Sequence, residues 1–281
     1  MNHSYSLHKI TDASNFAFCP DAYSRFKFGD SAVAESFGIA LAEGFIREVL
    51  QQSPIRTQVV VISSPYAFIP TATFAMKDHF VYRLNRWLAD HHLPIVQETK
   101  VHRTITYKED YGALNAEERL RLIGNDSFHV DKHFLEGKTL IFLDDIKITG
   151  SHERMIMKMV SEYQLDNEIY MLYFAELINS EIHPNVENTL NYHEVRRIFD
   201  LERIIDSGRF CFNTRVVKYI LNYEPSGFHL FLEGQTDQFI NQLYNMALGN
   251  GYHTIEAYAA NLNYIKDYLF STNNKLIEYG N

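Results

Sequence analysis

The sequence contains few cysteines and no long apolar run. Of its 281 residues, only Cys19 and Cys211 are cysteines, and they form no C-x-x-C pair. This excludes a zinc ribbon or a disulfide framework and is typical of a reducing compartment. No apolar stretch reaches the length that spans a bilayer, and the N-terminal MNHSYSLHKITD lacks the charged-then-apolar pattern of a signal peptide. We therefore expect a cytoplasmic protein.

Positive charge is in the minority. Lys and Arg number 26 against 35 Asp and Glu, which gives a formal net charge of -9. We expect neither nucleic acid nor a membrane as a partner, because both are anionic and would repel the chain. A local basic pocket is compatible with this balance. Hydrophobic residues make up 46% of the chain, enough for a sizeable core.

Strand and helix patterns alternate over the first two thirds of the chain. Three segments predict strands: 57–64, 139–143 and 167–177. The centre of 57–64 is a run of β-branched apolar residues, which is typical of a strand covered on both faces. Four segments show helical spacing: 31–52, which Asp30 or Ser31 can cap, then 71–90, 113–126 and 151–163. Residues 95–107 alternate and favour a strand or hairpin. This order predicts an α/β fold with a mainly parallel central sheet flanked by helices.

The last third of the chain has a different pattern. It is mostly helical and rich in Tyr, Phe, Asn and Leu, with one strand-like piece, GFHLFLE, at 227–233. No linker rich in Gly, Ser or Pro precedes it. We therefore expect an α/β core with N-terminal elements over residues 1–183, and a helical region over 184–281 that packs on this core.

The segment TLIFLDDIKITGSHERMI, at 139–156, ends an apolar strand on Asp144 and Asp145. Ligands of open parallel sheets bind beyond the carboxyl ends of the strands. Gly150 permits a tight turn whose N–H groups point inward, and the following helix can contribute up to ~2 kcal/mol to phosphate binding. The acids suit sugar hydroxyls or a divalent cation. This pattern predicts a sugar-phosphate site; the alternative is that the acids merely end a strand and cap a turn.

The motif LIFLDDIKITGS resembles the phosphoribosyl pyrophosphate (PRPP) motif of type I phosphoribosyltransferases. The longer segment 103–153 is similar to the ComF-like branch in its order of parts: an Arg-Thr start, a Leu-x-x-x-x-Arg helix, a Phe-x-Val stretch, Gly-Lys before the strand, then the acids. YSRFKFGD, at 23–30, and the C-terminal helices resemble a bacterial subgroup found near tellurium-resistance-type stress genes. The resemblance implies a type I phosphoribosyltransferase fold with a helical C-terminal extension.

The resemblance also implies roles for the acidic motif. Asp144 and Asp145 would bind the ribose 2′- and 3′-hydroxyls and hold Mg²⁺, directly or through water. The PRPP 5′-phosphate would lie on the turn formed by Lys147, Ile148, Thr149, Gly150 and Ser151. Some purine-specific members carry a proton-transferring acid near Ile148, which isoleucine cannot replace. His152 follows this turn. We expect it to have a surface role at the helix start, and contact with the ligand is the alternative.

A pyrophosphate site is expected after the strand at 57–64. The residues implied are Ser63, Ser64, Pro65 and Tyr66, whose backbone amides and hydroxyls can hold phosphate oxygens. The alternative is a plain strand-to-helix connection.

The family also has a mobile loop that closes over the reaction centre, and residues 100–112 correspond to it. Arg103 is the first candidate to hold departing pyrophosphate, because a planar guanidinium binds phosphate oxygens in a bidentate manner. Lys100 and Lys108 are further candidates, with a solvated charge as the alternative.

The function implied is Mg²⁺-dependent transfer of a 5-phosphoribosyl group between PRPP and a nitrogenous base, with release of pyrophosphate. Asp144, Asp145 and Arg103 are the expected catalytic residues. The expected partners are PRPP, a small base or nucleotide, and a second copy in a homodimer. Tyr66 and the segment 209–223 are candidates for a base-binding hood. Two alternatives stay open: a catalytically weak sensor of PRPP or nucleotides on the same fold, and an interaction scaffold that acts through its C-terminal helices.

Overall fold

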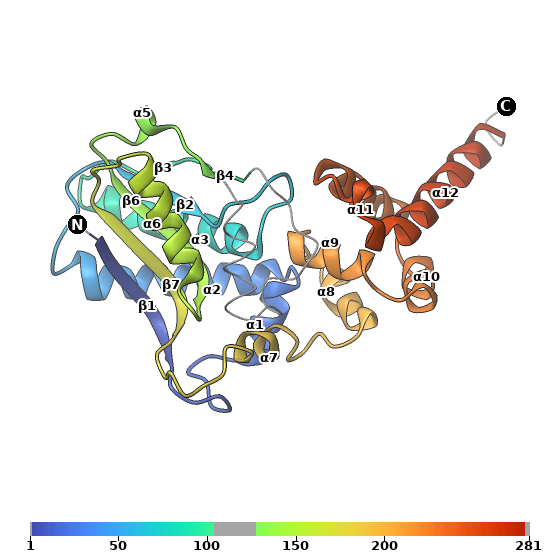
Figure 1. Cartoon of the computed structure of the whole chain (residues 1–281), viewed down its shortest axis with the longest axis horizontal. Coiled ribbons are helices and arrows are strands. Elements are labelled where there is room, and N and C mark those ends of the chain that lie inside the picture. The colour runs from blue at the N-terminus through green and yellow to red at the C-terminus, as the bar shows by residue number, and fades with distance from the viewer. Residues whose placement is uncertain (1, 104–127, 279–281) are drawn as a thin grey trace.

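The computed structural model describes residues 2–103 and 128–278, with side chains for 2–101 and 129–271. At its centre is a five-stranded sheet in which all neighbouring strands are parallel (Figure 1). From edge to edge, the strands are β1 (Asn2–Ile10), β7 (Ile169–Leu177), β6 (Thr139–Lys147), β2 (Val59–Ser63) and β3 (Gln97–Glu98). The predicted fold class is therefore confirmed.

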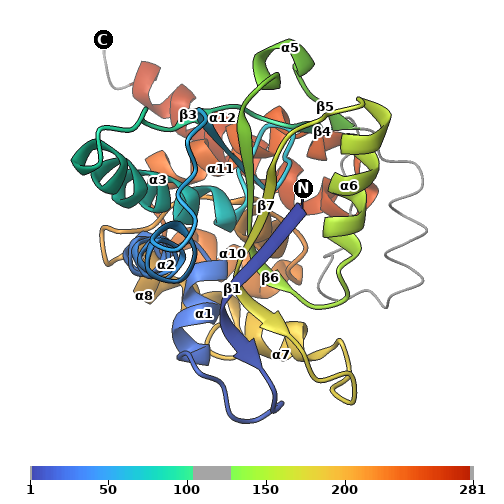
Figure 2. The ribbon, with the colours of Figure 1, turned by 90° about the vertical axis from the view of Figure 1, so that its left-hand side faces the viewer.

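Helices cover both faces of the sheet (Figure 2), because successive side chains of its apolar strands point to opposite faces. Alternate residues of β2 pack with α2 (Ser31–Phe45) and α3 (Ala72–Asp90) on one face and with α6 (Ser151–Glu162) on the other. Asp30 caps α2, since its carboxylate accepts hydrogen bonds from two backbone N–H groups at 3.0 and 3.2 Å. A π-helical turn, Ile46–Leu50, extends α2.

Shorter elements complete the N-terminal part: α1 (Pro20–Lys27), β4 (His102–Arg103), β5 (Phe128–His129) and α5 (Lys132–Leu135). β4 and β5 form an antiparallel pair. Neither α1 nor β1 was predicted; β1 is an edge strand whose half-exposed side chains include many polar ones. The segment predicted as a strand or hairpin, 95–107, contains β3 and β4. The helix predicted at 113–126, and the closing loop beyond residue 103, lie outside the described residues.

The strand predicted at 139–143 is longer than expected. β6 continues to pair with β7 as far as Lys147, so Asp144 and Asp145 lie within the strand, not after it. The other predicted strands and helices in the described part of the core agree with the observed bounds within two residues.

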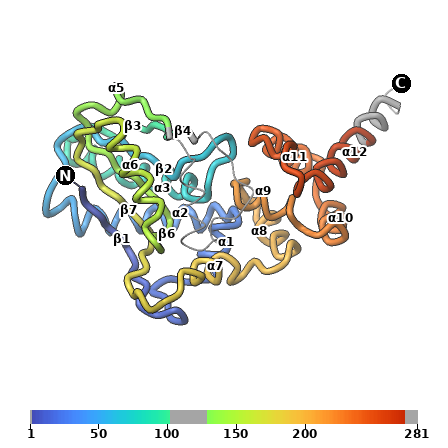
Figure 3. Tube along the Cα trace, in the orientation of Figure 1, coloured from blue at the N-terminus to red at the C-terminus, as the bar shows by residue number. Residues whose placement is uncertain are grey.

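The helical C-terminal region lies beside the sheet (Figure 3). Its helices are α7 (Val186–Asn191), α8 (Glu202–Ile205), α9 (Thr214–Leu221), α10 (Pro225–Glu233), α11 (Asp237–Gly249) and α12 (Glu256–Glu278), with 3-10 turns at Ile198–Leu201 and Tyr252–Thr254. The strand expected at 227–233 was wrong. Pro225 begins a helix there, the Glu224 side chain caps it, and Phe228, Phe231 and Leu232 form its buried face.

This helical region is joined to the core by direct packing. Phe28 and Ile69, from the N-terminal part, are fully buried among its apolar side chains. The backbone N–H of Cys211 donates to the Gly29 carbonyl oxygen at 2.8 Å. A Cβ on Gly29 would lie 2.3 Å from the Cys211 carbonyl oxygen, and its φ of +91 favours glycine. The close approach brings α9 to the carboxyl ends of the sheet strands.

Candidate functional site

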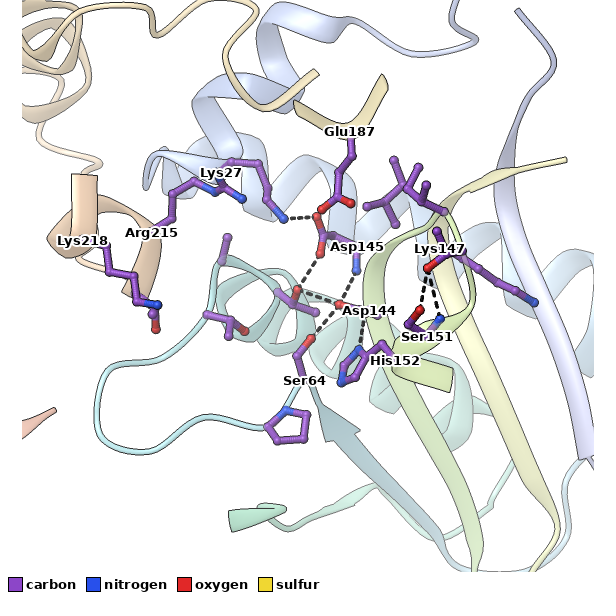
Figure 4. A pocket seen from close by; sticks show the side chains of 18 of the residues that line it. Lys27, Ser64, Asp144, Asp145, Lys147, Ser151, His152, Glu187, Arg215 and Lys218 are labelled. Atoms are coloured by element: carbon purple, nitrogen blue, oxygen red, sulfur yellow. Dashed lines mark hydrogen bonds and ion pairs between the residues drawn. The ribbon is translucent and has the colours of Figure 1, made fainter. Parts of the chain in front are cut away.

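A cavity of about 620 Å³ lies where the carboxyl ends of β2 and β6 face α7 and α9 (Figure 4). The core contributes the acid pair, the turn that follows it and Ser64. The helical region contributes a second wall, made of Glu187, Tyr192, Arg196, Thr214, Arg215, Lys218, Tyr219, Asn222, Tyr223 and Tyr258. The site is therefore composite and requires both parts of the chain.

Asp145 is a buried carboxylate held by three side chains. Its Oδ2 accepts hydrogen bonds from the Tyr23 hydroxyl, at 2.5 Å, and from Lys27 Nζ, while Oδ1 accepts from Thr73 Oγ1 at 3.1 Å. Asp145 is 5% exposed and Lys27 9% exposed. Burial and the nearby Asp145 charge raise the pKa of Tyr23 well above its usual value, so this hydroxyl remains a donor. Lys27 supplies the positive charge that a buried carboxylate needs.

Asp144 has a separate set of partners. Its Oδ1 accepts from Ser64 Oγ at 2.6 Å and from Thr73 Oγ1 at 3.3 Å, and its Oδ2 lies 2.5 Å from His152 Nδ1. Burial opposes ionisation of Asp144, but His152 and the hydrogen bond from Ser64 outweigh it and lower the pKa of Asp144 below its usual value. The surface role expected for His152 was wrong, because its ring lines the cavity against this carboxylate.

The turn after the acids contains Thr149, Gly150 and Ser151, which line the cavity. Gly150 has a φ of 68, in the left-handed region, and α6 begins directly after it. The Thr149 and Ser151 hydroxyls lie 2.7 Å apart, and Arg154 donates to the Thr149 carbonyl at 2.9 Å and to Ser151 Oγ at 2.9 Å. A helix start of this kind is an ordinary anion-binding feature.

Lys147 and Ile148 were also predicted to bind the 5′-phosphate, but their side chains contact other groups. Lys147 Nζ lies 2.7 Å from Glu153 and 3.2 Å from Glu176, and in Figure 4 it points away from Asp145. Ile148 packs against the apolar core. Both residues nevertheless line the main cavity.

The residues predicted to bind pyrophosphate are divided between two cavities. Ser64 and Pro65 line the main cavity. Ser63, Ser64, Tyr66 and Lys100 line a smaller cavity of about 270 Å³ next to it. Ser64 belongs to both.

Lys100 lies in the smaller cavity. Its Nζ donates to the Ala67 carbonyl at 2.6 Å and lies 3.9 Å from the centre of the Tyr66 ring. Burial lowers the pKa of Lys100. Arg103 belongs to β4, but its side chain lies outside the described residues, as does the whole of Lys108.

Sequence reasoning missed several residues of the site. Tyr23 and Lys27 are four residues apart on α1, a spacing that places both on one helical face. Pro20, at the start of α1, was a usable signal for this helix. The segment 209–223, by contrast, was named as a candidate base-binding hood: Arg215 and Lys218, three residues apart on α9, and Asn222, directly after this helix, line the cavity.

The described residues contain no group of three or more His, Cys, Asp or Glu side chains arranged to hold a metal ion. Each carboxylate oxygen of Asp144 and Asp145 already accepts a hydrogen bond or pairs with a basic side chain. Mg²⁺ is usually held by one or two carboxylates together with substrate phosphates. The residues therefore fit Mg²⁺ that arrives with a phosphate-bearing ligand, not one that the protein alone encloses.

Comparison with known proteins supplies a family match. The family model described as PRTase ComF-like matches residues 1–265. The chain also resembles two solved hypoxanthine phosphoribosyltransferases. The one from Staphylococcus aureus is 10% identical, with a TM-score of 0.34, and the match covers 52% of this chain and 75% of that one. The one from Trypanosoma cruzi is 14% identical, with a TM-score of 0.31, and the match covers 54% of this chain and 77% of that one. These values are too low to support an argument. No curated protein matches, and no described helix is both long and apolar enough to cross a bilayer.

Proposed function

Because the chain belongs to the ComF-like family of phosphoribosyltransferases, we propose that it moves a 5-phosphoribosyl group between PRPP and a nitrogenous base, with release of pyrophosphate. One observation supports this most strongly: the acids Asp144 and Asp145 and the turn at 149–151 open into the same cavity. Carboxylates suit sugar hydroxyls, and the N–H groups at a helix start suit a phosphate.

In this proposal, the ribose lies over the acid pair. Its 2′- and 3′-hydroxyls donate to Asp144 and Asp145 and take over hydrogen bonds that Ser64 and Thr73 now make. The 5′-phosphate binds the backbone N–H groups of Thr149, Gly150 and Ser151 at the positive end of α6.

The leaving pyrophosphate lies on the side of Ser64. Ser63, Ser64, Pro65 and Tyr66 bind it, with Lys100 as the basic group nearby. Arg103 stays the first candidate for this role from the sequence. Lys100 would exchange its bond to the Ala67 carbonyl for one to a phosphate oxygen. Asp144 and Asp145 orient the sugar so that its anomeric carbon faces the helical wall, and their negative field stabilises the positive charge that develops there.

Mg²⁺ bound with PRPP would neutralise charge on the departing pyrophosphate, and Asp144 and Asp145 are the residues that would hold it. Lys27 and His152 now contact these carboxylates. Lys27 and His152 therefore have to give up part of their contact with Asp145 and Asp144 when the ligand binds. The acceptor base enters from the wall formed by α7 and α9.

A second candidate function is a sensor that binds PRPP or a nucleotide with little turnover. Two observations favour it: the acid pair is already satisfied by protein groups, and Ile148 offers no proton acceptor. The two functions differ only in whether pyrophosphate forms.

Calorimetry with PRPP and Mg²⁺ tests the proposal, together with an assay for released pyrophosphate in the presence of mixed bases. We expect Asp145→Asn to bind PRPP at least tenfold more weakly than wild type, about 1.4 kcal/mol, because one sugar-hydroxyl acceptor loses its charge. The matched control is Asp166→Asn, an exposed acid at the amino end of β7, away from the cavity. Equal affinities of wild type and Asp145→Asn would refute the proposal, whereas tight binding without pyrophosphate would favour the sensor.

A further inference from the structure

The helical wall of the cavity carries excess positive charge. Among its described lining residues it has three cationic side chains, Arg196, Arg215 and Lys218, and one carboxylate, Glu187, a balance of 3 − 1 = +2. The whole chain has a net charge of -9. Local positive charge in an acidic protein, gathered at a cavity, attracts anions to that place.

The acid pair of the core, Asp144 and Asp145, does not depend on this charge. Lys27 pairs with Asp145, His152 pairs with Asp144, and Lys147 pairs with Glu153. The acid pair thus has its own partners within the core. In Figure 4, Arg215 and Lys218 extend from α9 on the side of the cavity opposite Ser151. Their charge is therefore separate from the turn proposed for the 5′-phosphate.

The same wall is aromatic. The ring of Tyr219 lies 6.0 Å from that of Tyr192 and 5.7 Å from that of Tyr223, and Phe28 packs edge-on behind Tyr219 at 5.0 Å. The guanidinium of Arg215 lies 5.8 Å from the centre of the Tyr192 ring. Aromatic faces and guanidinium planes favour a flat ring by stacking.

Tyr219 also offers an unused polar group. Its hydroxyl is buried and has no hydrogen-bond partner in the described part of the chain. Burial raises the pKa of Tyr219 far above its usual value, so the hydroxyl stays protonated and can donate. Buried polar groups usually have partners in native proteins, and an oxygen of a ligand in the cavity can supply this one.

We propose that the acceptor is a heteroaromatic acid, whose ring stacks among Tyr192, Tyr219 and Tyr223 and whose carboxylate binds Arg215 and Lys218. This inference rests on the proposed function, because it assigns the acceptor of the same reaction. It goes beyond that function by naming the chemical class of the base: a flat nitrogen heterocycle that carries its own negative charge.

Paired probes, in which one member carries a carboxylate and the other is neutral, test the inference. We would titrate the PRPP-bound protein with pyridine-3-carboxylate against pyridine-3-carboxamide, and with uracil-6-carboxylate against uracil, by calorimetry. In at least one pair, the acid should bind about tenfold more tightly than its neutral partner. Lys218→Gln should reduce that preference to less than about threefold. The matched control, Lys266→Gln, removes an exposed charge of α12 and should keep the full preference.

The outcomes separate this inference from the proposed function. Failure of wild type to bind PRPP would refute the proposed function itself. PRPP binding without preference for either acid, including no detectable binding of any probe, would overturn only the heteroaromatic acid. If Lys218→Gln instead weakened binding of pyrophosphate and left the preference intact, the wall would serve the leaving group and the inference would also fail.

Discussion

The ion pair between Lys27 and Asp145 gives the most direct test of how the site is held together. Both side chains are buried, at 9% and 5% exposed. Removing one partner of a buried pair costs about 3–5 kcal/mol, because the other charge stays buried without compensation. In Lys27→Met, Tyr23 and Thr73 still donate to Asp145, so we expect the lower end, about 3 kcal/mol.

The assay is equilibrium unfolding in urea at pH 7, with the free energy of unfolding taken from the transition. Lys27→Met should lose about 3 kcal/mol, and Lys27→Met combined with Asp145→Asn should regain most of that loss, because no buried charge then remains uncompensated. Lys266→Met, a change at an exposed position, should alter stability by less than about 0.5 kcal/mol. The reasoning would be refuted if Lys27→Met were as stable as wild type. It would also be refuted if the double variant lost the sum of the stability losses of Lys27→Met and Asp145→Asn.

Two further predictions concern acid stability and chain geometry. The pKa of Asp144 is lowered in the folded protein. Its contribution to stability is therefore present above the usual aspartate pKa of about 3.9 and is lost as the pH falls below that value. Unfolding measured from pH 7 to pH 3 should show a steeper loss of stability for wild type than for Asp144→Asn, and parallel curves would contradict this. Gly29→Ala should lower the free energy of unfolding by more than Gly208→Ala. Both positions have positive φ, but only a Cβ at Gly29 meets a backbone oxygen, that of Cys211 at 2.3 Å. Equal losses in thermal unfolding would contradict this and show that the contact with Cys211 relaxes freely.

The core strands could be predicted because their local composition was decisive. Residues 57–64, 139–143 and 167–177 are apolar enough that burial on both faces is the one stable arrangement. The acid motif within this framework indicated the family, which the match over residues 1–265 confirms. The edge strand β1 was not predicted, because its side chains are half exposed and its partner, β7, lies more than 160 residues away along the chain. The piece at 227–233 is short and apolar, a pattern that does not distinguish strand from helix.

The site was harder to predict than the fold, because it depends on contacts between distant segments. The acids and the turn are contiguous in sequence and could be named together. Tyr23 and Lys27, which hold Asp145, come from 122 and 118 residues earlier. The wall of Arg215 and Lys218 follows some seventy residues after the motif. No local pattern links these segments, and only the packing of α1 and α9 on the core brings them to one cavity.

The central claim, that a pentose phosphate lies across the acid pair and the turn, is tested most directly by a crystal structure with ribose 5-phosphate. The account predicts that the phosphate oxygens lie within hydrogen-bond distance of the backbone N–H groups of residues 149–151. It also predicts that the 2′- and 3′-hydroxyls contact Asp144 and Asp145, with Lys27 displaced from its present contact. A phosphate bound instead against Arg215 and Lys218, with the acid pair unchanged, would contradict it.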